Sequence, residues 1–102
     1  MDEFGVGYQV FTASGVVKTA GLPVAIYSIY INSDGVGGGL GRLYNGTAAA
    51  APDILYSFAE SAANINSVHP LAAGQGVVFP NGCYVEIPAN VDYATVVYQV
   101  VN

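Results

Sequence analysis

His69 is the only histidine of this chain, so it is the first residue to weigh as a base or a metal ligand. A nucleophilic dyad needs a nucleophile held beside the base, and a zinc site needs further ligands. A lone histidine followed by Pro70 supplies neither by itself. We therefore interpret His69 as a structural residue.

The seven acidic residues are the other group that could do chemistry. Apart from Asp2 and Glu3 they are scattered singly along the chain, and nothing in their spacing marks two of them as the acid and base of a glycosidase. A small β-sandwich glycan hydrolase is therefore the least favoured function. We predict a protein that is not an enzyme, with no catalytic residue.

The motifs for ions and nucleotides are incomplete. Residues 32–35 (Asn-Ser-Asp-Gly) resemble the start of a calcium loop but lack the glutamate at its twelfth position. The glycine-rich residues 35–41 lack the lysine of a phosphate-binding loop. We expect no metal and no cofactor. Cys83 is the only cysteine, so no internal disulfide forms, and its apolar neighbours predict a buried thiol.

The chain has 102 residues, of which 53 % are hydrophobic and only 9 % are charged, with a net charge of −5. Lys18 and Arg42 are its only basic residues, too few to neutralise a nucleic acid or to bind an anionic membrane. The acidic start lacks the features of a signal peptide. So few charges on a small domain predict a surface that is covered by other protein.

The elements expected to form this surface are β-strands. Val, Ile, Tyr and Thr alternate between turn signals, and no sustained helical period is present. Ser14-Gly15 and Pro80-Asn81-Gly82 each predict a hairpin. We expect about eight short strands in one all-β domain, an antiparallel β-sandwich with a jelly roll as first choice. Residues 1–7 are expected to be an N-terminal arm, and residues 8–102 the sandwich domain.

The longest expected strand, residues 22–32, is apolar on both faces, so both faces should be covered. Strict alternation places Tyr27, Ile29 and Ile31 on one face, and Val24, Ile26, Ser28 and Tyr30 on the other. Tyrosine is enriched in interfaces because it gives rigid area with a polar tip. The predicted partner interface consists of Phe4, Tyr27, Tyr30, Tyr44 and Tyr98.

Three segments of residues 26–101 carry a resemblance to a known family. They are RLYNGTAAAAPDILYSF (42–58), GQGVVFPNGCYVEI (74–87) and YATVVYQVV (93–101). Their turns and alternation resemble a small jelly-roll domain of tailed-bacteriophage virion proteins. Asn45 departs from the pattern, since an acid is common at that position.

The resemblance implies a structural role on the virion, after synthesis in the cytoplasm of the host bacterium. A bare domain suits a capsid decoration or cement protein, which would act as a homotrimer bound to the major capsid protein or to other virion proteins. The alternative is a component of the tail, neck or fibre that recognises a glycan or receptor through tyrosines such as Tyr44 around residues 35–41.

Overall fold

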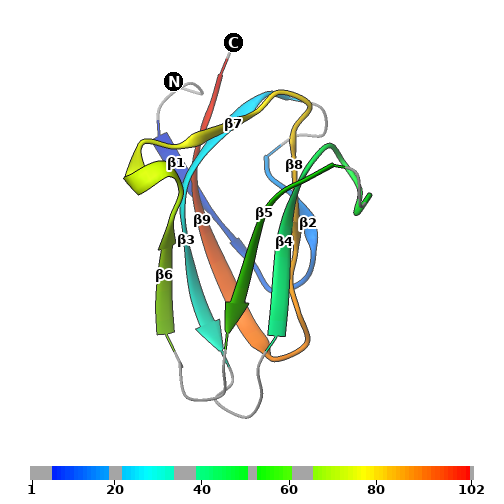
Figure 1. Ribbon diagram of the computed structural model, residues 1–102, viewed down its shortest axis with the longest axis vertical. Helices are drawn as coiled ribbons and strands as arrows, with labels where there is room; N and C mark the ends of the chain where they lie inside the picture. The colour runs from blue at the N-terminus through cyan, green and yellow to red at the C-terminus, as the bar shows by residue number, and fades with distance from the viewer. Residues whose placement is uncertain (1–5, 19–21, 34–38, 51–52, 61–65, 102) are drawn as a thin grey trace.

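The alternating apolar residues form β-strands in the computed structural model, which describes residues 6–18, 22–33, 39–50, 53–60 and 66–101 (Figure 1). The described residues contain nine strands: β1 (Val6–Phe11), β2 (Gly15–Val16), β3 (Val24–Ser33), β4 (Gly39–Asn45), β5 (Ile54–Glu60), β6 (Asn66–Pro70), β7 (Val77–Phe79), β8 (Cys83–Glu86) and β9 (Val91–Val100). One 3-10 turn, η2 (Ala72–Gly74), links β6 to β7.

The strands form two antiparallel sheets that pack face to face. One has the order β1-β9-β3-β6, with β7 also paired to β3, and the other has the order β2-β8-β4-β5. If β6 and β7 are taken as one interrupted strand, the chain pairs from its ends inward: β1 with β9, β2 with β8, β3 with β6 and β7, and β4 with β5. This winding of one long antiparallel ribbon is that of a jelly roll. The predicted all-β sandwich is confirmed.

The two predicted hairpins are wrong, although the chain does turn at both places. β1 pairs with β9 while β2 pairs with β8, so the turn at Ser14 carries the chain from one sheet to the other. The turn at Pro80-Asn81-Gly82 does the same, because β7 pairs with β3 while β8 pairs with β2 and β4. Gly82 has a φ of 94°, the left-handed conformation expected of glycine in a turn.

The core lies between the inner faces of the sheets. Its fully buried side chains are Phe79, Ile26, Ile29, Ile31, Leu43, Leu71, Val17, Val24, Val85, Val96 and Cys83. Gly41 of β4 lies opposite Phe58 of β5, and a Cβ on Gly41 would come within 2.1 Å of the Phe58 ring. The phenylalanine ring thus occupies the space that glycine leaves open.

A β-bulge at Tyr27 corrects the expected faces of the longest strand. The pairing of β3 with β9 shifts between Ile26 and Ser28, so Tyr27 is an extra residue. Val24, Ile26, Ile29 and Ile31 therefore all point to the core, whereas strict alternation had separated them into two faces. The carbonyl of Tyr27 accepts a hydrogen bond from the N–H of Leu71 at 3.0 Å, at the break between β6 and β7.

The expected arm of residues 1–7 overlaps the first strand. Val6 and Gly7 belong to β1 and pair with Gln99 and Tyr98 of β9. Residues 1–5 lie outside the described part of the chain.

Candidate interaction surface

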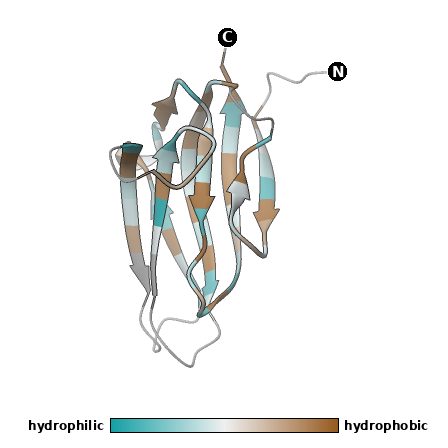
Figure 2. Ribbon diagram, turned by 90° about the vertical axis from the view of Figure 1, so that its right-hand side faces the viewer, coloured by the Kyte–Doolittle hydropathy of each residue, from teal (hydrophilic) through white to brown (hydrophobic). Residues whose placement is uncertain are grey.

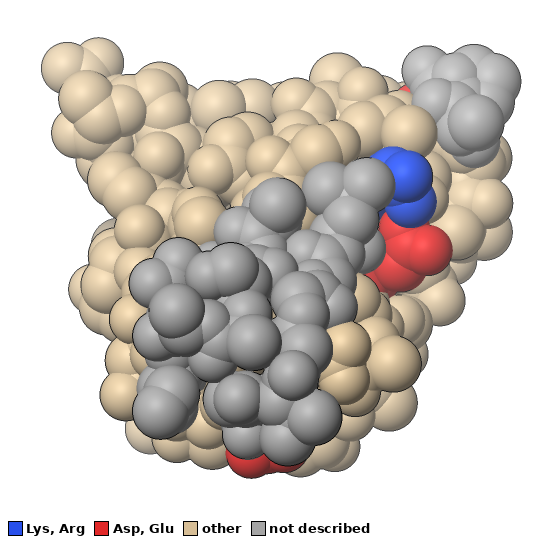
Figure 3. Space-filling model, turned by 60° about the horizontal axis from the view of Figure 1, so that its bottom comes forward, with Lys and Arg blue, Asp and Glu red and all other residues tan. Residues whose placement is uncertain are grey.

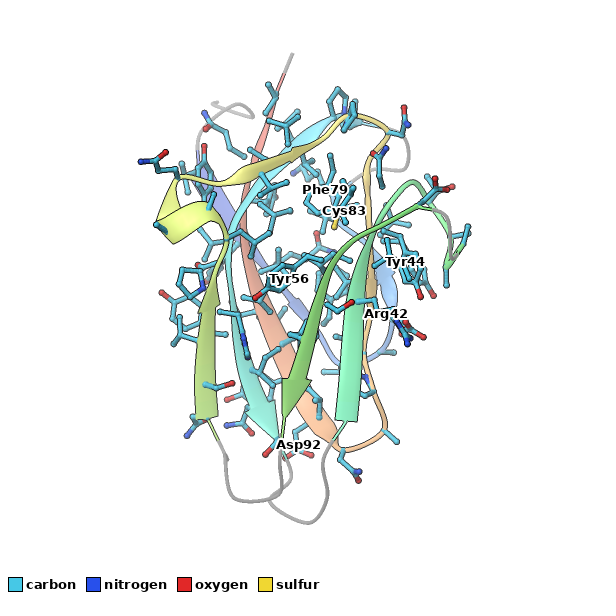
Figure 4. All side chains as sticks on the ribbon, viewed as in Figure 1. Arg42, Tyr44, Tyr56, Phe79, Cys83 and Asp92 are labelled. Atoms are coloured by element: carbon cyan, nitrogen blue, oxygen red, sulfur yellow. The ribbon has the colours of Figure 1, made fainter. Side chains whose placement is uncertain are left out.

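The outer face of the larger sheet is a region where the low charge of this chain is evident. Strand alternation, seen as bands of hydropathy along the ribbons in Figure 2, turns one set of side chains to the core and the other outward. In the paired rows, the described outward residues are all uncharged: Val6, Tyr8, Val10, Ala25, Tyr27, Ser28, Tyr30, Asn32, Asn66, Val68, Pro70, Val78, Tyr93, Thr95, Val97 and Gln99. Asp92, which is exposed, is the extra residue of a second irregularity between the pairs Asn32–Tyr93 and Ser33–Val91, at the lower end of the sheet (Figure 4).

Large apolar side chains are exposed mainly on this same face. Among the described residues, the strongly exposed ones on it are Val6, Tyr8, Val10, Tyr30, Val68, Val78 and Tyr93, and the remaining one, Leu55, belongs to β5 of the other sheet. Large exposed apolar patches often mark interaction sites, so this face is the candidate interaction surface.

The most exposed of these residues follow one another on β1. Val6, Tyr8 and Val10 are 64 %, 66 % and 55 % exposed, and we call these three the β1 stripe. Gly7, Gln9 and Phe11 alternate with them and face inward, opposite Tyr98, Val96 and Ala94 of β9.

β1 is also an edge strand. It pairs only with β9, so its other edge presents unpaired backbone groups within the described chain. Proteins normally protect such edges with lysine, proline, a bulge or an inward charge. The six residues of β1, VGYQVF, contain no charged residue and no proline, and their register with β9 is continuous.

Two shallow depressions interrupt the outer face. The first, of about 530 Å³, is lined by Ala25, Tyr27, Gln75, Gly76, Val78, Gln99, Val100 and Val101. In it the Tyr27 hydroxyl donates a hydrogen bond of 2.7 Å to Oε1 of Gln99. The second, of about 460 Å³, is lined by Tyr30, Ile31, Asn32, Asn66, Ser67, Val68, Tyr93 and Thr95.

The outer face of the smaller sheet differs, because it holds a charged pair. Nη1 of Arg42 donates to Oε1 of Glu86 at 3.2 Å, and the Tyr44 hydroxyl donates to the same oxygen at 2.7 Å. Tyr84 lies edge-on to Tyr44, with ring centroids 6.0 Å apart. The bond to Glu86 raises the pKa of Arg42 and also that of Tyr44. In the view of Figure 3 most of the described surface is neither basic nor acidic, and the basic patch lies directly against an acidic one.

The residues predicted from sequence as a partner interface occupy different environments. Tyr30 is 46 % exposed on the outer face of the larger sheet, and Tyr27 is half-buried there. Tyr44 and Tyr98 are only 4 % and 9 % exposed, so their rings pack within the domain and present little area to a partner. Phe4 lies outside the described residues.

The β1 stripe and Tyr93 are not among the interface residues predicted from sequence. The apolar residues 6, 8 and 10 alternate with the period of a strand, which could have predicted the stripe. The expected arm of residues 1–7, however, separated Val6 from Tyr8 and Val10. Tyr93 belongs to the apolar run of β9, and only the pairing with Asn32 shows that it faces outward.

His69 has structural partners. Its Nε2 lies 3.0 Å from the Ser67 hydroxyl oxygen, and its ring centroid lies 5.6 Å from that of Phe58, with the two ring planes tilted by 41°. Ser67 and His69 are two residues apart on β6, so they share one face of the strand. Across the described ranges no three His, Cys, Asp or Glu side chains come together as a metal site. We interpret the pair as packing at the open edge between the sheets.

Comparison with known proteins assigns this chain to no family. No family model, no curated protein and no solved structure matches it. Among the residues that the structure describes, no helix has the length and apolar character needed to cross a membrane.

Proposed function

We propose that this protein is a structural subunit of a bacteriophage virion, a capsid decoration protein that assembles as a homotrimer. The observation that carries the proposal is the uncharged outer face of the larger sheet, with the β1 stripe at its open edge. In this proposal the stripe is the part of the face that contacts other protein.

The energetics favour burial of this stripe. Burying one fully exposed valine or leucine side chain contributes about 1.5–3 kcal/mol. The three residues of the stripe are more than half exposed in the single chain. A contact repeated by the symmetry of a trimer and of a shell multiplies such modest terms. No charge on the stripe has to be desolvated when two protein surfaces meet there.

The virion role rests on the sequence resemblance. The described residues of the first segment lie mainly in β4 and β5, those of the second in β7, β8 and the turn between them, and those of the third mainly in β9. The jelly roll is an architecture of viral capsid subunits, but it also serves lectins and other proteins, so the fold by itself does not give the function. The proposed partners are the major capsid protein and further copies of this chain.

Binding to shells tests the proposal. Purified protein is mixed with undecorated capsids of the phage that encodes it and pelleted. Tyr8→Lys places a charge in the β1 stripe, and Leu55→Lys places one at an exposed apolar residue of the other sheet. We expect the wild type and Leu55→Lys to pellet with the shells and Tyr8→Lys to stay in the supernatant. Failure of the wild type to pellet with shells would contradict the capsid role, and pelleting with tails instead would assign the tail or fibre position.

A further inference from the structure

Six of the eight residues that line the second depression of the outer face form an ordered array on three neighbouring strands. In one row Val68, Tyr30 and Thr95 are paired across β6, β3 and β9. In the next row Asn66, Asn32 and Tyr93 are paired in the same way. We call these six residues the tyrosine–asparagine array. Its volume of about 460 Å³ is in the range of small-ligand sites.

The two asparagines hold each other in place. Nδ2 of Asn32 donates to Oδ1 of Asn66, a cross-strand bond that fixes both amide planes. The bond leaves a carbonyl oxygen on Asn32 and an NH₂ group on Asn66. If both amides were turned over, the outcome would be the same, with one acceptor and one donor side by side. A fixed acceptor beside a fixed donor suits a pair of adjacent hydroxyl groups, each of which can donate and accept.

Two tyrosines supply the apolar part of the array. Tyr30 and Tyr93 are 46 % and 43 % exposed, diagonal to each other across β3 and β9. Each offers an aromatic face and a hydroxyl. A pyranose ring has the complementary structure, since its C–H groups form an apolar face and its hydroxyls form a polar rim.

The charge of the site favours a neutral sugar. None of the residues that line the depression is charged, and the whole chain carries −5. An acidic sugar would meet no basic group there and would be repelled by the net charge of the protein.

We propose that the tyrosine–asparagine array binds a neutral hexopyranose, with the ring against Tyr30 or Tyr93 and two adjacent hydroxyls on the asparagine pair. The array spans β6, β3 and β9 and borders the β1 stripe where Thr95 is paired with Val10, but it includes no residue of the stripe. The proposal therefore does not depend on the assembly role. It also moves glycan recognition away from Tyr44, which is buried.

The combination of groups favours a sugar over a protein partner. A protein contact needs a broad apolar area, whereas this hollow places three hydrogen-bonding side chains, those of Asn32, Asn66 and Thr95, beside two tyrosines and one valine. Those groups fix orientation, which is what a small polar ligand requires.

A screen followed by matched variants tests the proposal. The wild type is applied to an array of neutral and acidic glycans, and methyl glycosides of glucose, galactose and mannose are titrated by NMR at concentrations up to about 50 mM, which detects millimolar dissociation constants. Asn66→Ala and Tyr93→Ala remove exposed groups of the array, so both variants should fold. Tyr8→Ala is the control, because Tyr8 is equally an exposed tyrosine of this sheet but lies in the β1 stripe.

We expect at least one neutral glycan to bind, with affinity reduced about tenfold or more by Asn66→Ala and by Tyr93→Ala and unchanged by Tyr8→Ala. The proposal is overturned if no neutral glycan binds, if acidic glycans bind better, or if Tyr8→Ala weakens binding as much as the array variants. Loss of capsid binding in the same variants without sugar binding would assign the array to a protein contact.

Discussion

At the scale of single residues, Cys83 shows how far local sequence can be taken. Its apolar neighbours predicted a buried thiol, and the structure confirms this, since Cys83 is fully buried in the core. Burial raises the pKa of the thiol from 9.0 to about 12. The thiolate, which is the reactive form, is therefore suppressed in the folded protein.

We expect Cys83 to be unreactive toward a disulfide reagent at pH 8 in the native protein and to react fully in urea. The same shift makes stability depend on pH. Above about pH 9 the unfolded chain loses the thiol proton while the folded chain keeps it, so stability should fall as pH rises from about 9 toward 12. Labelling of Cys83 is measured by mass spectrometry. Rapid labelling of the native protein at pH 8 would contradict this burial.

The tyrosines predicted as interface residues show that residue type alone does not predict which way a side chain points. Composition predicted that tyrosine surface is used for contacts, but it could not tell an outward tyrosine from an inward one. Tyr98 is inward opposite Gly7, whereas Tyr30 is outward opposite Thr95. That difference depends on strand register, which no short window of sequence contains.

At the scale of elements, the positions of the strands followed from alternation and turn residues, but their partners did not. Ser14-Gly15 and Pro80-Asn81-Gly82 correctly predicted turns. Whether the chain after a turn pairs with the strand before it or crosses to the other sheet is decided by contacts far apart in sequence. The bulge at Tyr27 was also not predicted, because no local sequence pattern marks it. It lies at the break between β6 and β7, where the Tyr27 carbonyl accepts a hydrogen bond from the N–H of Leu71.

Close packing between β4 and β5 gives a prediction for this scale. Gly41→Ala would place a methyl group 2.1 Å from the buried Phe58 ring, so we expect it to destabilise the protein by about 1–3 kcal/mol. Gly7→Ala is the matched control, since its Cβ would lie at an ordinary 3.6 Å from the Tyr98 hydroxyl. Urea denaturation of both variants measures the difference. Equal stabilities would show that Phe58 does not fill the space above Gly41.

At the scale of the whole molecule, the few charged residues of the chain are unevenly distributed between the two sheets. The described charged pair, Arg42 and Glu86, lies on the smaller sheet, while the larger sheet presents an uncharged outer face. The sequence indicated that some surface is covered by protein. That coverage stays a prediction, and the uncharged face could not be located from sequence, because it is assembled from five strands that are distant along the chain.

Light scattering across a dilution series is the most direct test of assembly through the β1 stripe. We predict a trimer for the wild type and for Leu55→Lys, because Leu55 lies on the other sheet, and a monomer for Tyr8→Lys at the same concentrations. A wild-type monomer at every concentration, or a trimer that Tyr8→Lys leaves intact, would contradict the account.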